Sequence, residues 1–285
     1  MSQNHEYPQE RHVDCFGLTG ENPGYRSFDR VAHQYDSSRF LPPEIQRAAA
    51  EAIVQLGGLR SADVLLDAGV GTGRFAVPVS RLGTRVVGVD ISTEMMRQLR
   101  SKLEASEETL RLVRGDLRHL PFADRSFGAA LVVHILHLIA DWQAVVEEIR
   151  RVLKPGAPLL LAQEAGRRMP TRETYFQLAR LRGAALAHLG AANADVVREH
   201  LVAQGADVKR RDADRFQWTM RIPVRDTLEM LRQRTWSHLW EVPEPDHAEV
   251  LEETEHWALK RYGSLDAVEE ATADLKIWVV RWPET

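Results

Sequence analysis

Two carboxylates and a glycine-rich turn are the groups whose types and spacing point to ligand binding. The apolar run Val64 to Leu66 leads into Asp67-Ala68-Gly69-Val70-Gly71-Thr72-Gly73, and Asp90 and Asp116 each follow a later apolar run. Glycine permits tight turns and leaves backbone amides uncovered, so a ligand can come close to the chain. A carboxylate at Asp90 can accept hydrogen bonds from both hydroxyls of a ribose. Asp116 suits the exocyclic amine of an adenine, so the set indicates an adenosine-containing ligand.

The glycine spacing argues against a nicotinamide dinucleotide. A dinucleotide-binding loop has Gly-x-Gly-x-x-Gly, with the pyrophosphate at the following helix N-terminus. Here the third glycine comes one position early, at Gly73, and Arg74 stands where that pattern has glycine. Together with Asp116, this spacing disfavours a nicotinamide-dependent oxidoreductase.

From about 63 to 165 the chain alternates between apolar runs and amphipathic stretches. This alternation predicts a parallel sheet with right-handed crossovers, buried on both faces. In such sheets ligands bind outside the carboxyl ends of the strands, where the acids and glycines fall. The expected strands are 64–66, 85–89, 110–113, 127–133 and 158–163, and the expected helices are 75–82, 93–103 and 142–153.

The flanking segments have other patterns. Phe28, Ala32 and Tyr35 recur at helical spacing, and a helix is expected from Glu44 to about Leu56. After residue 166 the pattern predicts a long helix reaching Leu189 and a strand at 215–222 with one apolar face. The other expected elements are a helix opened by Asn193 or Asp195, helices at 224–240 and 246–262, and a last strand at 275–282.

With these motifs in order, the chain resembles the class I S-adenosylmethionine-dependent methyltransferases, in particular the group that includes the ubiquinone and menaquinone biosynthesis enzymes. Val70 and Ala157 depart from that group, in which a small residue such as cysteine and a second glycine are usual. The matching motifs cover about half of the chain: Asp67 to Gly73, Val89-Asp90-Ile91-Ser92, Gly115-Asp116 with Leu120-Pro121-Phe122, and Glu148-Ile149-x-x-Val152-Leu153-Lys154-Pro155-Gly156.

The resemblance implies an α/β, Rossmann-like fold with a mostly parallel seven-stranded sheet, an antiparallel C-terminal edge and a helical cap. It implies a single domain in three parts. Residues 1–56 form an N-terminal flap and helix, 57–165 the cofactor-binding core, and 166–285 a helical cap inserted around the last two strands.

The same resemblance implies S-adenosyl-L-methionine as cofactor and S-adenosyl-L-homocysteine as product. Asp90 would hold the ribose, Asp116 and Leu117 the adenine, and Gly69 with Gly71 the methionine end near Asp67. The flap would bring Tyr25, Tyr35 or Arg39 near the methionine end, although the segment can equally serve only as packing. The implied cofactor residues are Tyr25, Tyr35, Arg39, Asp67, Ala68, Gly69, Gly71, Asp90, Ile91, Met95, Asp116, Leu117 and His134.

The expected reaction is an in-line methyl transfer to a small molecule, in which the protein mainly aligns the acceptor and excludes water. His134 ends the fourth strand and is the candidate catalytic residue, since an unperturbed imidazole titrates near neutrality. It can equally be a hydrogen-bonded histidine beside the pocket, and His137 is expected to be structural. The alternatives are a methyltransferase acting on tRNA or protein, and a non-catalytic S-adenosylmethionine-binding regulator.

Composition limits the partners. The net charge of −4, from 37 basic and 41 acidic side chains, gives no electrostatic reason to expect nucleic acid or an anionic membrane. The only cysteine is Cys15, no signal peptide is visible, and the longest apolar run, 129–140, is too short to span a bilayer. We therefore expect a cytoplasmic monomer or homodimer without a metal ion. The late tryptophans and the arginines at 167, 168, 172, 180 and 182 could line a substrate pocket, or they could pack and solvate the cap.

Overall fold

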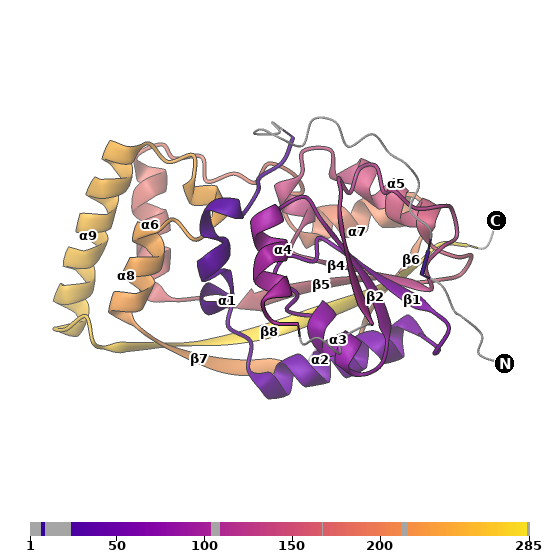
Figure 1. Ribbon diagram of the computed structural model, residues 1–285. Coiled ribbons are helices and arrows are strands. Elements are labelled where there is room, and N and C mark those ends of the chain that lie inside the picture. Colours follow the sequence, from indigo (N-terminus) through magenta and orange to yellow (C-terminus); the bar gives the residue numbers. More distant parts are fainter. Residues whose placement is uncertain (1–6, 9–23, 104–108, 167, 212–215, 284–285) are drawn as a thin grey trace.

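Five parallel strands form the centre of the sheet (Figure 1). The computed structural model describes residues 7–8, 24–103, 109–166, 168–211 and 216–283, so Cys15, Arg167 and the start of the expected flap lie outside the described residues. The central strands lie in the order β3-β2-β1-β4-β5, and the parallel core predicted from the apolar runs is confirmed. Their bounds are β1 Val64–Ala68, β2 Arg85–Asp90, β3 Leu110–Arg114, β4 Ala129–Val133 and β5 Leu159–Gly166.

The antiparallel edge is larger than expected. The last strand, β8 (Val268–Arg281), runs antiparallel to β5 and pairs on its other side with two short strands. β7 (Gln217–Pro223) pairs with the first half of β8 and β6 (Asp207–Arg211) with the second half. The sheet described therefore has eight strands rather than seven. β6 was not predicted because it is mostly exposed and carries no apolar alternation.

Helices cover both faces of the sheet. α2 (Pro43–Gly57) and α3 (Ala76–Arg81) pack on one face, and α5 (Trp142–Val152) and α7 (Ala194–Ala203) pack on the other. α4 (Thr93–Arg100) follows β2 and contributes to both apolar clusters. Asn193 opens α7 by accepting hydrogen bonds from two backbone amides, as one of the two expected capping residues.

The cap consists of α6 (Pro170–Leu181), α8 (Val224–Arg232) and α9 (Glu244–Tyr262), which share one apolar cluster. Two expected helices are shorter than predicted. α6 ends at Leu181 rather than Leu189, because Gly183 follows with φ +85°. α8 ends at Arg232 rather than 240, and a separate turn, η3 (Ser237–Leu239), follows. Since α7 and β6 lie on the core, residues 166–285 are not all cap.

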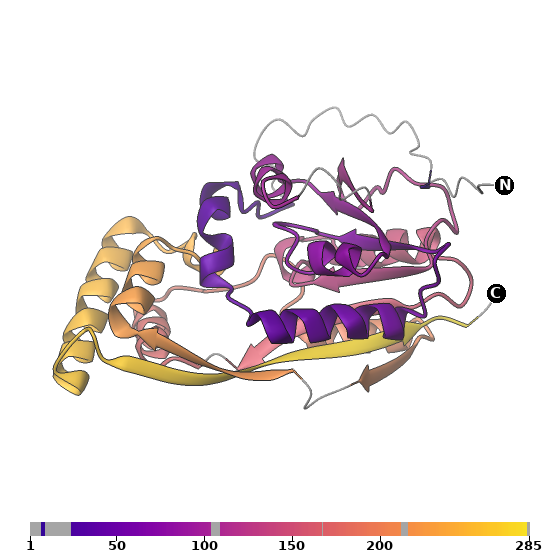
Figure 2. The same cartoon turned by 60° about the horizontal axis from the view of Figure 1, so that its bottom comes forward.

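The N-terminal strap, residues 24–39, joins the cap to the core. It contains η1 (Asp29–Gln34) and α1 (Tyr35–Ser38), so the expected helical spacing is confirmed. Figures 1 and 2 show α1 between the cap helices and the core. Asp29 accepts hydrogen bonds from Ser92 and Glu94 at the start of α4, and Asp36 accepts one from Thr72 in the glycine turn at 2.5 Å. Within the described residues, no helix is long and apolar enough to cross a membrane.

Candidate functional site

The glycine turn after β1 is closed by backbone hydrogen bonds to the neighbouring strand. The amides of Gly69 and Val70 both donate to the carbonyl of Val89, at 2.8 and 3.0 Å. Gly69 has φ +85°, and a Cβ there would lie 2.8 Å from Cγ1 of Ile135. Both the backbone conformation and the close approach therefore require glycine at this position.

Asp90 is held at the carboxyl end of β2 by two backbone amides. One oxygen accepts from Gly71 at 2.8 Å and the other from Ser92 at 2.9 Å. Burial raises the pKa of Asp90, although these hydrogen bonds oppose the shift. Each carboxylate oxygen has two lone pairs, so both oxygens retain the capacity to accept a ligand hydroxyl.

Asp67 lies beneath the turn. It is 3% exposed, and burial together with the nearby charge of Asp90 raises its pKa to about 7. Ala68 is fully buried next to it. Neither residue lies on the wall of the cofactor pocket described next.

The cofactor pocket lies between the glycine turn, the ends of β2 and β4, and the strap. It brings together most of the predicted cofactor residues: Tyr25, Tyr35, Gly69, Gly71, Asp90, Ile91, Met95, Leu117 and His134. It also contains Arg26, Ser27, Phe28, Ser92, Val133, Ile135 and Leu138, which the sequence reasoning did not single out. Ile135 directly follows His134 in the sequence and Leu138 comes four positions after it, which was the available signal for them.

Tyr25 lies at the expected adenine end of this pocket, not at the methionine end. Its hydroxyl donates to Asp116 at 3.1 Å and accepts from the amide of Leu117 at 3.2 Å. Burial and the charge of Asp116 raise the pKa of Tyr25, so the phenol is protonated. Asp116 also binds Arg118 through both oxygens, and although burial opposes it, these bonds lower the pKa of Asp116. The hydroxyl of Tyr25 therefore already hydrogen-bonds the carboxylate of Asp116 and the amide of Leu117, the two groups expected to bind an adenine.

His134 lies in a strained backbone conformation, with φ +51°. Its Nε2 accepts a hydrogen bond from the amide of Glu164 at 2.8 Å. We infer that the neutral ring carries its proton on Nδ1, since a nitrogen that accepts a hydrogen bond is unprotonated. With the proton on Nδ1, the imidazole can donate one hydrogen bond.

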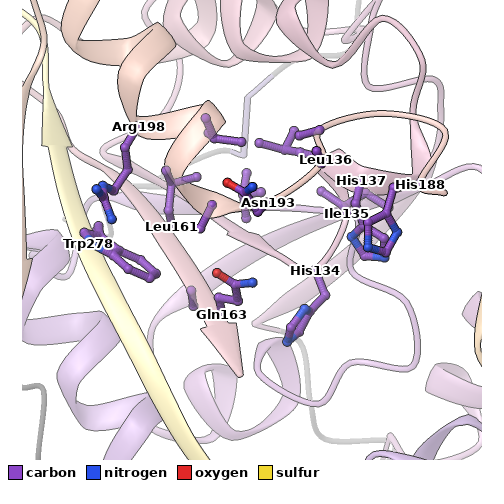
Figure 3. Close-up of a pocket in the computed structure, with 16 residues that line it drawn as sticks. His134, Ile135, Leu136, His137, Leu161, Gln163, His188, Asn193, Arg198 and Trp278 are labelled. Carbon is purple, nitrogen blue, oxygen red and sulfur yellow. The ribbon is translucent and has the colours of Figure 1, made fainter. Parts of the chain in front are cut away.

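Two further cavities adjoin His134, on either side of β5. The sheet cavity, shown in Figure 3, has Gln163 on its wall together with Asn193, His188 and Trp278. The cap cavity has Glu164 on its wall and is closed by the strap and the cap. Gln163 and Glu164 face different cavities because successive side chains of a strand point to opposite sides.

Arg39 lines the cap cavity and not the cofactor pocket. The other charged side chains on its wall are Arg172 of α6 and Glu164, and Glu164 binds Arg74 at 2.6 Å. Three histidines also contribute to the wall, and burial is the main cause that lowers their pKa values: His137, His188 and, to about 3, His238.

Comparison with known proteins gives this geometry a context. Residues 66–161 match the family model described as a methyltransferase domain. This segment is a class I methyltransferase domain. It contains the glycine turn, Asp90, Asp116 and His134, and its edges coincide with β1 and β5.

Two curated relatives are methyltransferases. The demethylmenaquinone methyltransferase of Tropheryma whipplei (strain Twist) is 35% identical over 140 residues, which are 48% of this chain and 57% of the relative. The malonyl-[acyl-carrier protein] O-methyltransferase of Yersinia pestis is 33% identical over 136 residues, 48% of each chain. The chain thus matches about half the length of these relatives. The strap, the cap and the antiparallel edge lie outside residues 66–161, which match the family model.

Solved structures resemble the fold of this chain over more of its length than the curated relatives do. The YcgJ protein of Bacillus subtilis matches with a TM-score of 0.57 and 20% identity, covering 84% of this chain and 99% of that one. The Rossmann-like α/β fold expected from the sequence is therefore confirmed. At this identity the match describes the fold alone.

Proposed function

We propose that this chain transfers a methyl group from S-adenosylmethionine to a small-molecule acceptor. The observation that carries the proposal is the cofactor pocket within a methyltransferase domain, where the glycine turn and Asp90 lie beside His134. The residues fit the cofactor, because both oxygens of Asp90 keep lone pairs for a ligand and Gly69, Gly71 and Asp90 lie on the wall of one pocket.

Each end of the pocket has its own role. Asp90 would bind the ribose hydroxyls, and Gly69 and Gly71 would leave room for the methionine end. Asp116 and Leu117 would read the adenine once the hydroxyl of Tyr25 leaves them. S-adenosylmethionine, when bound, supplies a methyl group already activated by the sulfonium charge.

The chain's own residues then align the acceptor and exclude water. The strap closes over the pocket and is anchored by Asp29 and Asp36. His134, at the junction of the cofactor pocket and the cap cavity, contacts the ligands and orients them through its Nδ1 proton. A general base is needed only if the acceptor atom carries a proton of high pKa.

We place the acceptor in the cap cavity. That cavity shares Phe28, Tyr35 and His134 with the cofactor pocket, so a molecule in it can reach the methyl group. In this proposal residues 1–56, 57–165 and 166–285 act as one catalytic unit. We also propose a cytoplasmic monomer or homodimer that does not bind nucleic acid, in keeping with the acidic balance of the chain.

The test is calorimetric titration of S-adenosylmethionine, followed by transfer of a labelled methyl group to pools of small metabolites. Asp90→Ala should weaken cofactor binding about tenfold or more, because charged hydrogen bonds are lost in a buried site. Unchanged affinity in that variant would refute the site. Binding without turnover on any metabolite would favour a regulator, and labelling of tRNA or protein would favour a macromolecular acceptor.

A further inference from the structure

The cap cavity combines an apolar lining with buried positive charge. Three methionines contribute thioethers to its wall, and Met169 and Met220 are themselves buried. Trp236, Phe28 and Ile222 complete the apolar surface. Such a lining suits an apolar body, and methionine adapts to its shape.

Two guanidinium groups converge on one indole in this cavity. The guanidinium of Arg39 lies 5.9 Å from the ring centroid of Trp236, and that of Arg172 lies 5.6 Å from the same centroid. Arg39 also lies 5.7 Å from the ring of Tyr35. Two positive charges therefore lie near the same indole and repel each other. An anion bound between them would offset this repulsion.

Arg39 has no carboxylate of the described residues within ion-pair distance. Its recorded hydrogen bond goes to the carbonyl of Ser38, at 3.4 Å. Burial lowers the pKa of Arg39, and Arg74 and Arg172 add to the effect, while Tyr35 and Glu164 oppose it. An arginine stays charged under these conditions. A cation that is partly buried and has no carboxylate partner destabilises a fold unless a ligand or partner compensates it.

The surrounding charges compensate this cation only in part, since Glu164 favours its charged form while Arg74 and Arg172 oppose it. Glu164 is the carboxylate on the cavity wall, and it is held by Arg74 at 2.6 Å. Arg172 has Glu173 at 3.4 Å and the more distant Glu269, both outside the cavity wall. Burial lowers the pKa values of His137, His188 and His238, so these three histidines of the wall are neutral near pH 7. The wall therefore carries more positive than negative charge.

We propose that the methyl acceptor is an organic acid, with a carboxylate held by Arg39 and Arg172 and an apolar, planar body against Trp236 and the methionines. That this acid is the methyl acceptor rests on the proposed function, whereas the anion site itself does not depend on methyl transfer. Two guanidinium groups on one side of the cavity form the fork-like donor set that carboxylates prefer.

The experiment compares 2-naphthoate with 2-naphthamide, which match in size and differ in charge. Each is titrated into the full chain by calorimetry at pH 7.5, with and without S-adenosylhomocysteine. The acid should bind about tenfold or more tightly than the amide, as expected for a charge-assisted hydrogen bond. Arg39→Gln should abolish this preference, and Arg39→Lys should retain part of it. Arg180→Gln, on an exposed position of the same helix as Arg172, is the matched control and should keep it.

Each other outcome is informative. If Arg39→Gln does not fold, Arg172→Gln makes the same test. Equal binding of acid and amide, or a preference that survives both substitutions, overturns the proposal. A preference lost instead in Arg198→Gln would place the anion in the sheet cavity and also overturns it. A failure of S-adenosylhomocysteine to bind would refute the proposed function, while the acid-to-amide ratio would still test the anion site.

Discussion

The hydroxyl of Tyr25 hydrogen-bonds both Asp116 and the amide of Leu117, at 3.1 and 3.2 Å. An adenine would use the same acceptor and the same donor. The backbone of the strap supports this placement, because Tyr25 forms a bridge with Ile139 and Arg26 donates its amide to Leu138. In this arrangement cofactor entry requires the phenol to move.

Tyr25→Phe should therefore tighten S-adenosylmethionine binding. The variant frees Asp116 and Leu117 from the phenol, and the expected gain is about threefold to tenfold, the value of one modest hydrogen bond. Calorimetric titration measures it. Tyr262→Phe, which removes a hydroxyl bound to Glu269 in the cap region, is the control and should leave affinity unchanged. Weaker binding by Tyr25→Phe would mean that the hydroxyl contacts the cofactor.

Asp67→Asn should stabilise the ligand-free protein at pH 8 but not at low pH. The pKa of Asp67 is raised to about 7 by burial and by Asp90. A carboxyl with a raised folded-state pKa contributes stability below its unfolded pKa, and this contribution is lost as pH rises through about 7. The difference amounts to roughly 2–4 kcal/mol, from ~1.4 kcal/mol per pKa unit.

Urea unfolding of wild type and Asp67→Asn at pH 5 and pH 8 measures this effect. The gain of the variant should be larger at pH 8, after the wild-type carboxyl has ionised. An equal change in the free energy of unfolding at both pH values would show that Asp67 ionises normally in the folded state.

Gly69→Ala should be more destabilising than Gly83→Ala. The two glycines have nearly equal φ values, +85° and +83°, so the backbone strain of an alanine is the same. They differ in space, because a Cβ at 69 meets Ile135 at 2.8 Å whereas a Cβ at 83 meets nothing within 4 Å. We expect a loss of about 1 kcal/mol for Gly83→Ala and about 2–4 kcal/mol for Gly69→Ala. Similar losses in chemical denaturation would mean that Ile135 moves aside at no cost.

Removing one partner of the buried pair Arg74 and Glu164 should destabilise the protein far more than removing one partner of an exposed pair. Their side chains are 9% and 3% exposed, whereas those of Arg47 and Glu51 are 80% and 44% exposed. Glu164→Gln leaves Arg74 buried without its partner, at a cost of about 3 kcal/mol or more. Glu51→Gln should cost less than about 0.5 kcal/mol. Thermal unfolding of the two variants compares them directly, and equal midpoints would be inconsistent with this account.

His134→Asn should be more stable than His134→Ala. The φ of +51° is tolerated by asparagine and disfavoured for alanine. Both variants lose the hydrogen bond from the amide of Glu164, because an asparagine oxygen overlays Nδ1 and does not reach the position of Nε2. If His134 orients ligands, kcat of His134→Asn falls by no more than about tenfold, whereas loss of a general base would reduce it by about 10²–10⁴-fold. Unfolding curves and methyl-transfer rates separate the two effects.

The core could be predicted from the sequence because its signals are local. Apolar runs of strand length that alternate with amphipathic stretches specify the order of the strands, and the glycines and acids that follow them mark the ligand edge. The same local reasoning located Asp90 and His134 at the pocket. It failed for β6, since a strand with charged residues on an exposed edge has no apolar alternation.

Positions that depend on long-range packing could not be predicted. Tyr25 and Arg39 belong to one strap, but they lie at opposite ends of the site because η1 crosses between them. Arg39 meets Trp236, nearly two hundred residues later in the chain, through the cap. No spacing within the sequence relates these residues, so the positive charge on the wall of the cap cavity could not be predicted from the sequence.

The long strand β8 has a mechanical consequence for substrate traffic. It runs from the cap across the core, as Figure 2 shows, and pairs with β5, β6 and β7 along its length. A rotation of the cap away from the core would break many backbone hydrogen bonds between β8 and its neighbouring strands at once, and each broken bond costs free energy. The strap is held instead by separate contacts of Tyr25, Arg26, Asp29 and Asp36, with no strand ladder of its own among the described residues. We therefore expect ligands to enter by displacement of this N-terminal segment, while the cap stays in place.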